Sequence, residues 1–290
     1  DLILKNLTRY EISIGVYSAY FPWRSKITLS EKTLVLLSVP SCPLEGGINL
    51  LLQSATSLYF ENVIESLQTR SGQLKHLEYL ANATDLVPHA AVFPVLESLY
   101  LSKLPNLKEI CCGQLSSGSF GELREVNLQS LPGLIHLWKG PTQGVCLGNL
   151  RCIEVQECHS MGSLFPQSMV TTLRQLETLK LADCNMMEEI VLKERGEDQA
   201  TNEIEFPKLK TLDIEKLPRL TGFCKGVDEI GFPQLEFLFL SKLPKLKSFC
   251  IPASDGNNDS TFQSPSLFNL EVGFPSLEVL ELDGLANLEG

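Results

Sequence analysis

The chain has 290 residues, 43% of them hydrophobic, and a formal net charge of −11. It is too apolar for a disordered chain, and the absence of any run of 18 apolar residues argues against a membrane span. The acidic balance argues against a nucleic-acid partner, because binding to duplex phosphates calls for a basic stripe.

Residues 1–92 contain short apolar patterns whose spacing is irregular. Positions 10–12 and 58–60 alternate in the manner of strands, and 27–29 and 34–37 also read as strands of uncertain register. We expect three to five degenerate repeats in this region.

From Phe93 onward one apolar template dominates the chain. In the stretch 93–110 it occupies positions 93, 96, 99, 101, 104, 107 and 110. Further copies begin at Phe120, Leu147, Leu173, Phe206, Phe232 and Phe274. The anchor leucines at 96, 123, 150, 176, 209, 235 and 277 are separated by steps of 27, 27, 26, 33, 26 and 42 residues. The regular step is typical of leucine-rich repeats.

The spacing of the template has a physical cause. Leu99-Tyr100-Leu101 alternates as a short strand does, whereas the later apolar residues recur at every third position, which suits a 3₁₀-like or irregular return. One unit cannot bury its own leucines, so neighbouring units must stack. We therefore predict an α/β leucine-rich-repeat solenoid (a horseshoe) with a parallel concave sheet and a convex side of irregular, 3₁₀ or short helical segments.

The domain prediction is one continuous solenoid in two parts. Residues 1–92 form irregular N-terminal repeats, and residues 93–290 form regular repeats with acidic insertions at 191–205 and 250–273. The chain has no initial Met, and the template leaves its last copy open at Gly290. We therefore expect a fragment of a longer protein.

Motifs of catalysis and of cofactor or metal binding were sought without success. The sequence has no G-x-x-x-x-G-K-[ST], G-x-G-x-x-G, H-E-x-x-H or G-x-S-x-G, and its four histidines are scattered. We predict no enzyme activity, no cofactor and no metal site in this chain. The nine cysteines show no regular pairing pattern, which favours a reducing compartment, whereas N-x-[ST] sequons at Asn6, Asn82 and Asn258 favour secretion.

The residues between the strand leucines should face solvent on the concave side. They form a varied surface with aromatics, and large aromatics in a polar groove are typical binding hot spots. The alternative for each aromatic is local packing against a loop or a neighbouring strand. The predicted partner-binding residues are Tyr100, Glu154, Lys180, Asp213, Phe237 and Phe239.

Four units share a Phe-Pro-x-Leu opening, at 93–96, 206–209, 232–235 and 274–277. With the continuations at 104–110 and 181–190 and the front at 7–15, they resemble the C-terminal repeats of plant coiled-coil, nucleotide-binding, leucine-rich-repeat disease-resistance proteins. The resemblance covers essentially the whole chain. It implies protein partners: a pathogen effector, a guarded host protein and the receptor's own nucleotide-binding module. ADP or ATP would bind only in an upstream module of the parent protein.

The resemblance favours the sensor region of an intracellular plant immune receptor, located in the cytoplasm, which also contributes to autoinhibition. Two alternatives stay open. One is an extracellular leucine-rich-repeat receptor ectodomain, supported by the sequons. The other is a substrate adaptor of a ubiquitin ligase, suggested by the repeat-core cysteines Cys158 and Cys184.

Overall fold

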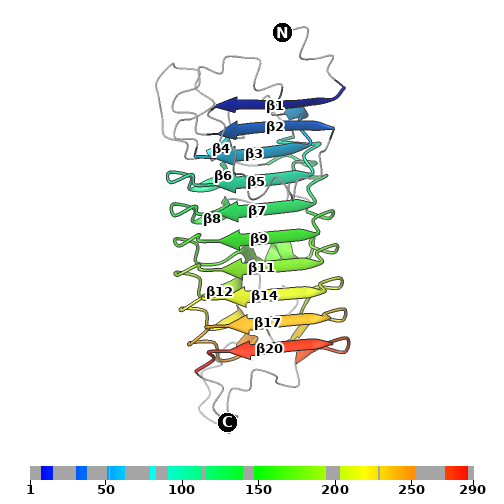
Figure 1. The fold of residues 1–290 in the computed structure, drawn as a ribbon. Coiled ribbons are helices and arrows are strands. Elements are labelled where there is room, and N and C mark those ends of the chain that lie inside the picture. Colours follow the sequence, from blue (N-terminus) through cyan, green and yellow to red (C-terminus); the bar gives the residue numbers. More distant parts are fainter. Residues whose placement is uncertain are drawn as a thin grey trace. The chain divides into compact units, whose positions relative to one another are not determined.

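The computed structural model describes residues 8–15, 31–37, 51, 53–62, 79–82, 91–112, 115–139, 147–193, 203–227, 229–251 and 272–286. It divides into two compact units, residues 1–147 (unit 1) and 148–290 (unit 2). Each unit consists mainly of short parallel strands, one after another along the chain (Figure 1).

Unit 1 has a main parallel sheet and a smaller one. The main sheet contains, in hydrogen-bonded order, β1 (Tyr10–Gly15), β2 (Lys32–Leu37), β3 (Ser57–Glu61), β5 (Ser98–Ser102) and β7 (Glu125–Gln129). The smaller sheet contains β4 (Tyr79–Asn82), β6 (Glu109–Cys112) and β8 (His136–Lys139). The strand predicted at 34–37 is thus confirmed as part of β2, whereas the one at 27–29 lies outside the described residues.

Unit 2 repeats the plan with one more small sheet. Its main sheet contains β9 (Cys152–Gln156), β11 (Thr178–Ala182), β14 (Thr211–Glu215), β17 (Phe237–Ser241) and β20 (Val279–Asp283). A second sheet contains β10 (Phe165–Pro166), β12 (Glu189–Leu192), β15 (Gly222–Lys225) and β18 (Cys250–Ile251). A third contains β13 (Glu203–Glu205), β16 (Glu229–Gly231) and β19 (Val272–Gly273), and the helix α3 (Gln167–Val170) follows β10.

These small sheets were not predicted, and they define the two insertions. The segment 191–205 leaves from β12 and returns as β13, and 250–273 leaves from β18 and returns as β19. Residues 194–202 and 252–271 lie outside the described residues. Each insertion is therefore attached to the repeats by strands at both ends.

The predicted leucines form the core. Six of the seven anchor leucines are 0% exposed, and Leu277 is half-buried. In the five-residue main strands from β5 to β17 the side chains alternate, so that the second and fourth point into the core and the others lie on the opposite face. Burial of each such leucine stabilises the fold by about 1.5–3 kcal/mol. This packing confirms the predicted leucine-rich-repeat solenoid fold.

The three-residue spacing of apolar residues before and after each main strand arises from β-turns on both sides of the strand. In Phe206–Leu209 the Leu209 N–H donates to the Phe206 carbonyl at 3.3 Å, and in Leu217–Leu220 the Leu220 N–H donates to the Leu217 carbonyl at 3.2 Å. Proline follows the first residue of both turns, and its fixed φ suits that position of a turn. The apolar residue at each end of a turn points into the core, which gives the period of three.

A column of left-handed residues stands between the strands and these turns. The residue after each main strand from β3 to β20 has a φ between 52° and 63°. Only the last of them is a glycine; the column comprises Asn62, Lys103, Ser130, Glu157, Asp183, Lys216, Lys242 and Gly284. The bend turns each N–H toward the neighbouring strand: Lys216 N–H donates to the Ser241 carbonyl at 2.9 Å and Lys242 N–H to the Asp283 carbonyl at 2.7 Å.

Phenylalanines stack through the core of unit 2. Phe206 and Phe232, which open successive repeats, lie 5.7 Å apart with nearly parallel rings, and Phe232 and Phe274 lie 5.6 Å apart. Phe223 and Phe249, which close repeats, add edge contacts to Phe232 at 5.5 and 5.9 Å. Neighbouring repeats are therefore joined by ring contacts as well as by the sheets.

Candidate partner-binding face

We call the face of each main sheet that lies opposite the buried leucines its open face. In unit 2 the strand register places five successive open-face residues in one central row. This row consists of Glu154, Lys180, Asp213, Phe239 and Glu281. Adjacent members are on hydrogen-bonded strands, hence about 4.8 Å apart at the backbone. The structure thus brings together four of the six predicted site residues.

The central row begins with an ion pair and becomes acidic beyond it. Lys180 Nζ lies 3.4 Å from Glu154 Oε1. Partial burial raises the pKa of the Asp213 carboxyl, Lys180 opposes the rise, and Glu215, Glu154 and Glu281 add to it. Burial is the largest cause of the raised pKa of Asp213, and three carboxylates and one lysine act on it besides.

Two rows flank the central one. The row at the start of the strands consists of Cys152, Thr178, Thr211, Phe237 and Val279. The row at their end consists of Gln156, Ala182, Glu215, Ser241 and Asp283. Phe237 is thus the fifth predicted site residue on this face, directly opposite Val279 on the next strand.

The aromatic part of the face is confined to β17. Phe237 and Phe239 are both half-buried, and Val279 beside them is half-buried as well. Phe239 has a carboxylate on each side, because Asp213 and Glu281 occupy the same row on β14 and β20. The sequence already placed these residues in one column; the register now shows that they are direct neighbours.

Salt bridges line the edge where the strands end. Lys216 Nζ lies 3.2 Å from Glu215 Oε1 and 3.4 Å from Asp183 Oδ2, and Lys242 Nζ lies 3.3 Å from the same Glu215 oxygen. Hydrogen bonds from the two ammonium groups lower the pKa of Glu215. These exposed pairs contribute little to stability, but they neutralise Glu215 and leave Asp213 and Glu281 as the acidic part of the central row.

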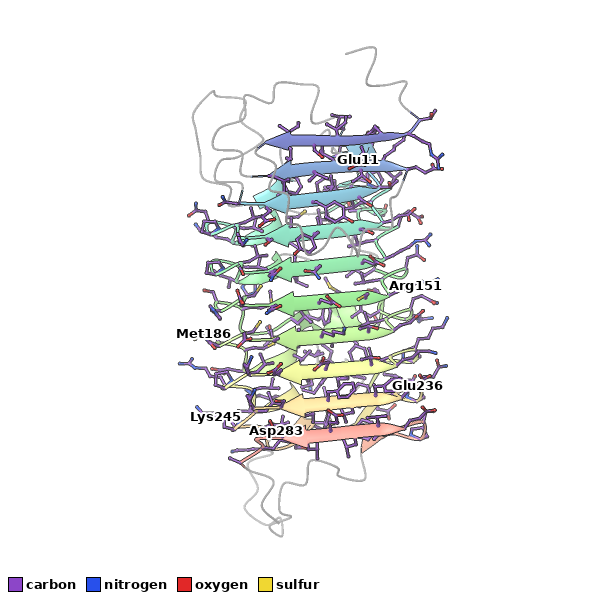
Figure 2. All side chains as sticks on the ribbon, in the orientation of Figure 1. Glu11, Arg151, Met186, Glu236, Lys245 and Asp283 are labelled. Carbon is purple, nitrogen blue, oxygen red and sulfur yellow. The ribbon has the colours of Figure 1, made fainter. Side chains whose placement is uncertain are left out.

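The opposite edge, where the strands begin, carries further ion pairs. Arg151 Nη1 lies 3.6 Å from Glu177 Oε1, and Lys210 Nζ lies 3.3 Å from Glu236 Oε1. Figure 2 shows Arg151 and Glu236 at this edge, with Met186 and Lys245 at the other. The open face of unit 2 therefore lies between two edges of paired charges.

The sequence predicted that Tyr100 is exposed, and this prediction is wrong. It lies on the open face of unit 1 but is only 9% exposed. Its ring stacks on Tyr59 at 5.9 Å, and its hydroxyl donates to Gln129 Oε1 at 2.9 Å. It joins a buried cluster with Tyr59, Val35 and Leu37. The alternative of local packing, left open by the sequence, describes Tyr100.

Sequence reasoning missed this cluster because the register of residues 1–92 was unknown. Val35 pairs with Tyr59, and Tyr59 pairs with Tyr100, so three strands contribute to one row. Burial, together with the nearby Glu125 carboxylate, raises the pKa of Tyr59 to about 12. The signal that could have indicated this cluster was the run of aromatic and branched residues at the strand centres of the irregular repeats.

The histidines, cysteines and carboxylates of the described residues were compared with the requirements of a metal site. No group of three or more His, Cys, Asp and Glu among them could hold a metal ion. Cys158 and Cys184 are 0% exposed, and a hydrogen bond with Cys158 lowers the pKa of Cys184. Both thiols lie in the repeat core, where they pack as small apolar side chains. In the same part of the chain, no helix is long and apolar enough to cross a membrane.

The repeats, their parallel sheets and the leucine core together define a leucine-rich-repeat solenoid. Within it, residues 113–185 match a family model described as plant disease resistance protein RPS2-like, leucine-rich repeats. The matched stretch contains β7, β9 and β11 and two of the predicted contact residues, Glu154 and Lys180. The chain matches no curated protein and no solved structure.

Proposed function

We propose that this chain is the sensor region of an intracellular plant immune receptor, which binds a protein partner on the open face of unit 2 and contributes to autoinhibition. The partners in view are a pathogen effector or a host protein that the effector alters, together with the receptor's own nucleotide-binding module. ADP or ATP would bind in that module, upstream in the parent protein, and the chain itself would carry out no catalysis.

One observation carries the proposal: Phe237 and Phe239 lie half-buried side by side on the open face, and Phe239 has a carboxylate-bearing residue on each neighbouring strand. Aromatic anchors amid polar residues are typical of protein-binding hot spots. The strands hold their positions through ladders of backbone hydrogen bonds, so the face is pre-formed for recognition. The match of residues 113–185 to repeats of plant resistance proteins supports the plant-defence setting.

The thiols support a cytoplasmic location. Six cysteines of the described part of the chain are free, and five of these are buried: Cys111, Cys158, Cys184, Cys224 and Cys250, with Cys152 half-buried. Cys224 and Cys250 are opposite each other in adjacent strands, within the Cα distance that a disulfide needs. In a reducing compartment the two neighbouring thiols would stay free and would not form a disulfide.

The test expresses the parent receptor in leaf tissue with Phe237→Ala and Phe239→Ala together. We expect normal accumulation but altered cell-death signalling: either loss of the response to the partner or signalling in its absence. The parent reading frame should encode a nucleotide-binding module upstream, and an F-box in that place would instead indicate a ubiquitin-ligase adaptor.

The matched control is the pair Met186→Ala and Leu192→Ala. These two side chains are 44% and 40% exposed and lie off the open face, so the control removes comparable apolar surface from unit 2. It should signal as the wild type does. If the phenylalanine variant and the control both behave like the wild type, the open face of unit 2 is not the recognition surface.

A further inference from the structure

The open face of unit 2 is chemically uneven along its length. The nine open-face positions of β14, β17 and β20 include four carboxylates, three apolar side chains and no lysine or arginine. The carboxylates are Asp213, Glu215, Glu281 and Asp283. The lysine of the central row, Lys180, neighbours Asp213 on the adjacent strand β11, and its ammonium group is paired with Glu154. The aromatic end of the face is therefore also its acidic end.

Two of these carboxylates are already engaged. Glu215 lies within 3.3 Å of two lysine ammonium groups, and Asp283 is within 3.5 Å of the Ser241 hydroxyl. By contrast, among the described residues no cation lies within 4.0 Å of the Asp213 or Glu281 carboxylates. The charge available to a partner is thus concentrated in the central row, on both sides of Phe239.

The geometry points to a basic protein segment as the partner of this face, with an arginine or lysine side chain lying over Phe239 between Asp213 and Glu281. An apolar side chain two residues from that cation in the segment packs on Phe237 and Val279. This inference rests on the proposed function and specifies the chemistry of the partner.

Three physical reasons favour such an occupant. A cation within about 6 Å of an aromatic ring is attracted by the negative face of the ring, and arginine is the usual choice. Neighbouring strands place the two carboxylates about 4.8 Å on either side of Phe239 at the backbone, within reach of one guanidinium. An arriving cation also relieves the repulsion that, with burial, raises the pKa of Asp213.

The spacing of the apolar contact follows from the strand. Phe237 and Phe239 are two residues apart on one side of β17, about 6.6 Å along the strand. Phe237 faces Val279 across the pair of strands, so the row at the start of the strands is apolar here and contains no charged side chain. A bound segment thus needs a cation and an apolar side chain separated by about two residues in extended conformation.

The experiment selects random twelve-residue peptides displayed on phage against the full 290-residue chain. Parallel selections use Asp213→Asn with Glu281→Gln, and a control in which Glu203→Gln and Glu229→Gln remove the same charge from β13 and β16. We expect the wild type and the control to enrich peptides with arginine or lysine near an apolar residue. Enrichment on the Asp213/Glu281 variant should fall at least about tenfold.

A synthetic version of the most enriched peptide then tests the cation directly by fluorescence anisotropy. Citrulline in place of its arginine keeps the shape and removes the charge, and should weaken binding at least about tenfold. The inference is overturned if the enriched peptides are neutral or acidic, if the Asp213/Glu281 variant retains the enrichment, or if no peptide is enriched.

The same selection separates this inference from the proposed function. Neutral or acidic peptides that bind the wild type but not a Phe237→Ala/Phe239→Ala variant would refute the basic partner and leave protein recognition by this face intact. If that phenylalanine variant enriches the same peptides as the wild type, recognition by this face fails as well.

Discussion

Replacing Phe232 by alanine should destabilise the chain far more than replacing Phe237, five residues later. Phe232 is 0% exposed and contacts Phe206 and Phe223 of the preceding repeat, Phe249 of its own repeat and Phe274 of the next one. Truncation of a buried phenylalanine costs about 3–5 kcal/mol. Because the lost ring contacts join three successive repeats, we expect a value in the upper half of that range, about 4–5 kcal/mol.

Phe237 is the matched control, since it is the same residue type in the same repeat but lies half-buried on the open face. Its truncation removes only part of a side chain from contact and should cost about 1 kcal/mol. Urea unfolding followed by circular dichroism gives both values, and amide exchange in β14, β17 and β20 shows whether the loss extends to neighbouring repeats. Equal destabilisation by the two substitutions would refute the view that Phe232 joins the repeats.

Three further experiments test the backbone and the ionisable groups. In urea unfolding, Lys242→Gly should be more stable than Lys242→Ala by about 1 kcal/mol. Both variants lose the ion pair with Glu215, but only glycine relieves the backbone strain at a φ of 56°. Equal stability of the two variants would contradict this strain. Since the folded-state pKa of Asp213 is raised, its ionisation lowers stability once the pH exceeds the unfolded value. Asp213→Asn should therefore stabilise the chain at pH 7, and this gain should shrink as the pH falls through the raised pKa; a gain that is constant with pH would count against it. The ultraviolet titration curves of the wild type and Tyr59→Phe at 295 nm should differ by the ionisation of one phenol with a pKa of about 12. A difference between the curves centred near pH 10 would show that Tyr59 is exposed.

The fold could be predicted from the sequence because the signal for it is repeated. Each copy of the template places leucines at the positions that become core, and the anchors from Leu96 to Leu235 are 0% exposed. A misassigned residue at one position of a single copy would have been corrected by comparison with the same position in the other copies. The strands β5, β7, β9, β11, β14 and β17 follow from this pattern alone.

The left-handed column could not be predicted, because its residues give almost no local signal. Glycine would mark a positive φ, yet only Gly284 occupies the column as a glycine, and the others include Lys103, Lys216 and Glu157. Their conformation is imposed by tertiary structure, through the N–H groups that must reach the neighbouring strand. The small sheets escaped prediction for a similar reason: strands of two to four residues are stable only beside their neighbours.

The template placed the candidate residues on the correct face where the register was regular, and their role in binding stays a prediction. Phe237, Phe239, Asp213, Lys180 and Glu154 lie on one face as the template required. Tyr100 has the same place in its repeat, but its neighbour Tyr59 belongs to the irregular region. Exposure thus depends on the adjacent strand as much as on the position within a repeat, and a template describes only the latter.

The repeat architecture separates what folds the chain from what a partner meets. Inward positions and both β-turns of a repeat are tied to the core, so substitutions there cost stability in more than one repeat. The open-face positions of a strand contact mainly their counterparts on the next strands, and they vary from copy to copy: Lys180, Asp213 and Phe239 occupy one row. The face can therefore change charge and shape at small cost in stability. Because the aromatics Tyr59 and Tyr100 of unit 1 are buried in a stack, whereas unit 2 presents half-buried aromatics beside carboxylates, we propose β14, β17 and β20 as the recognition surface.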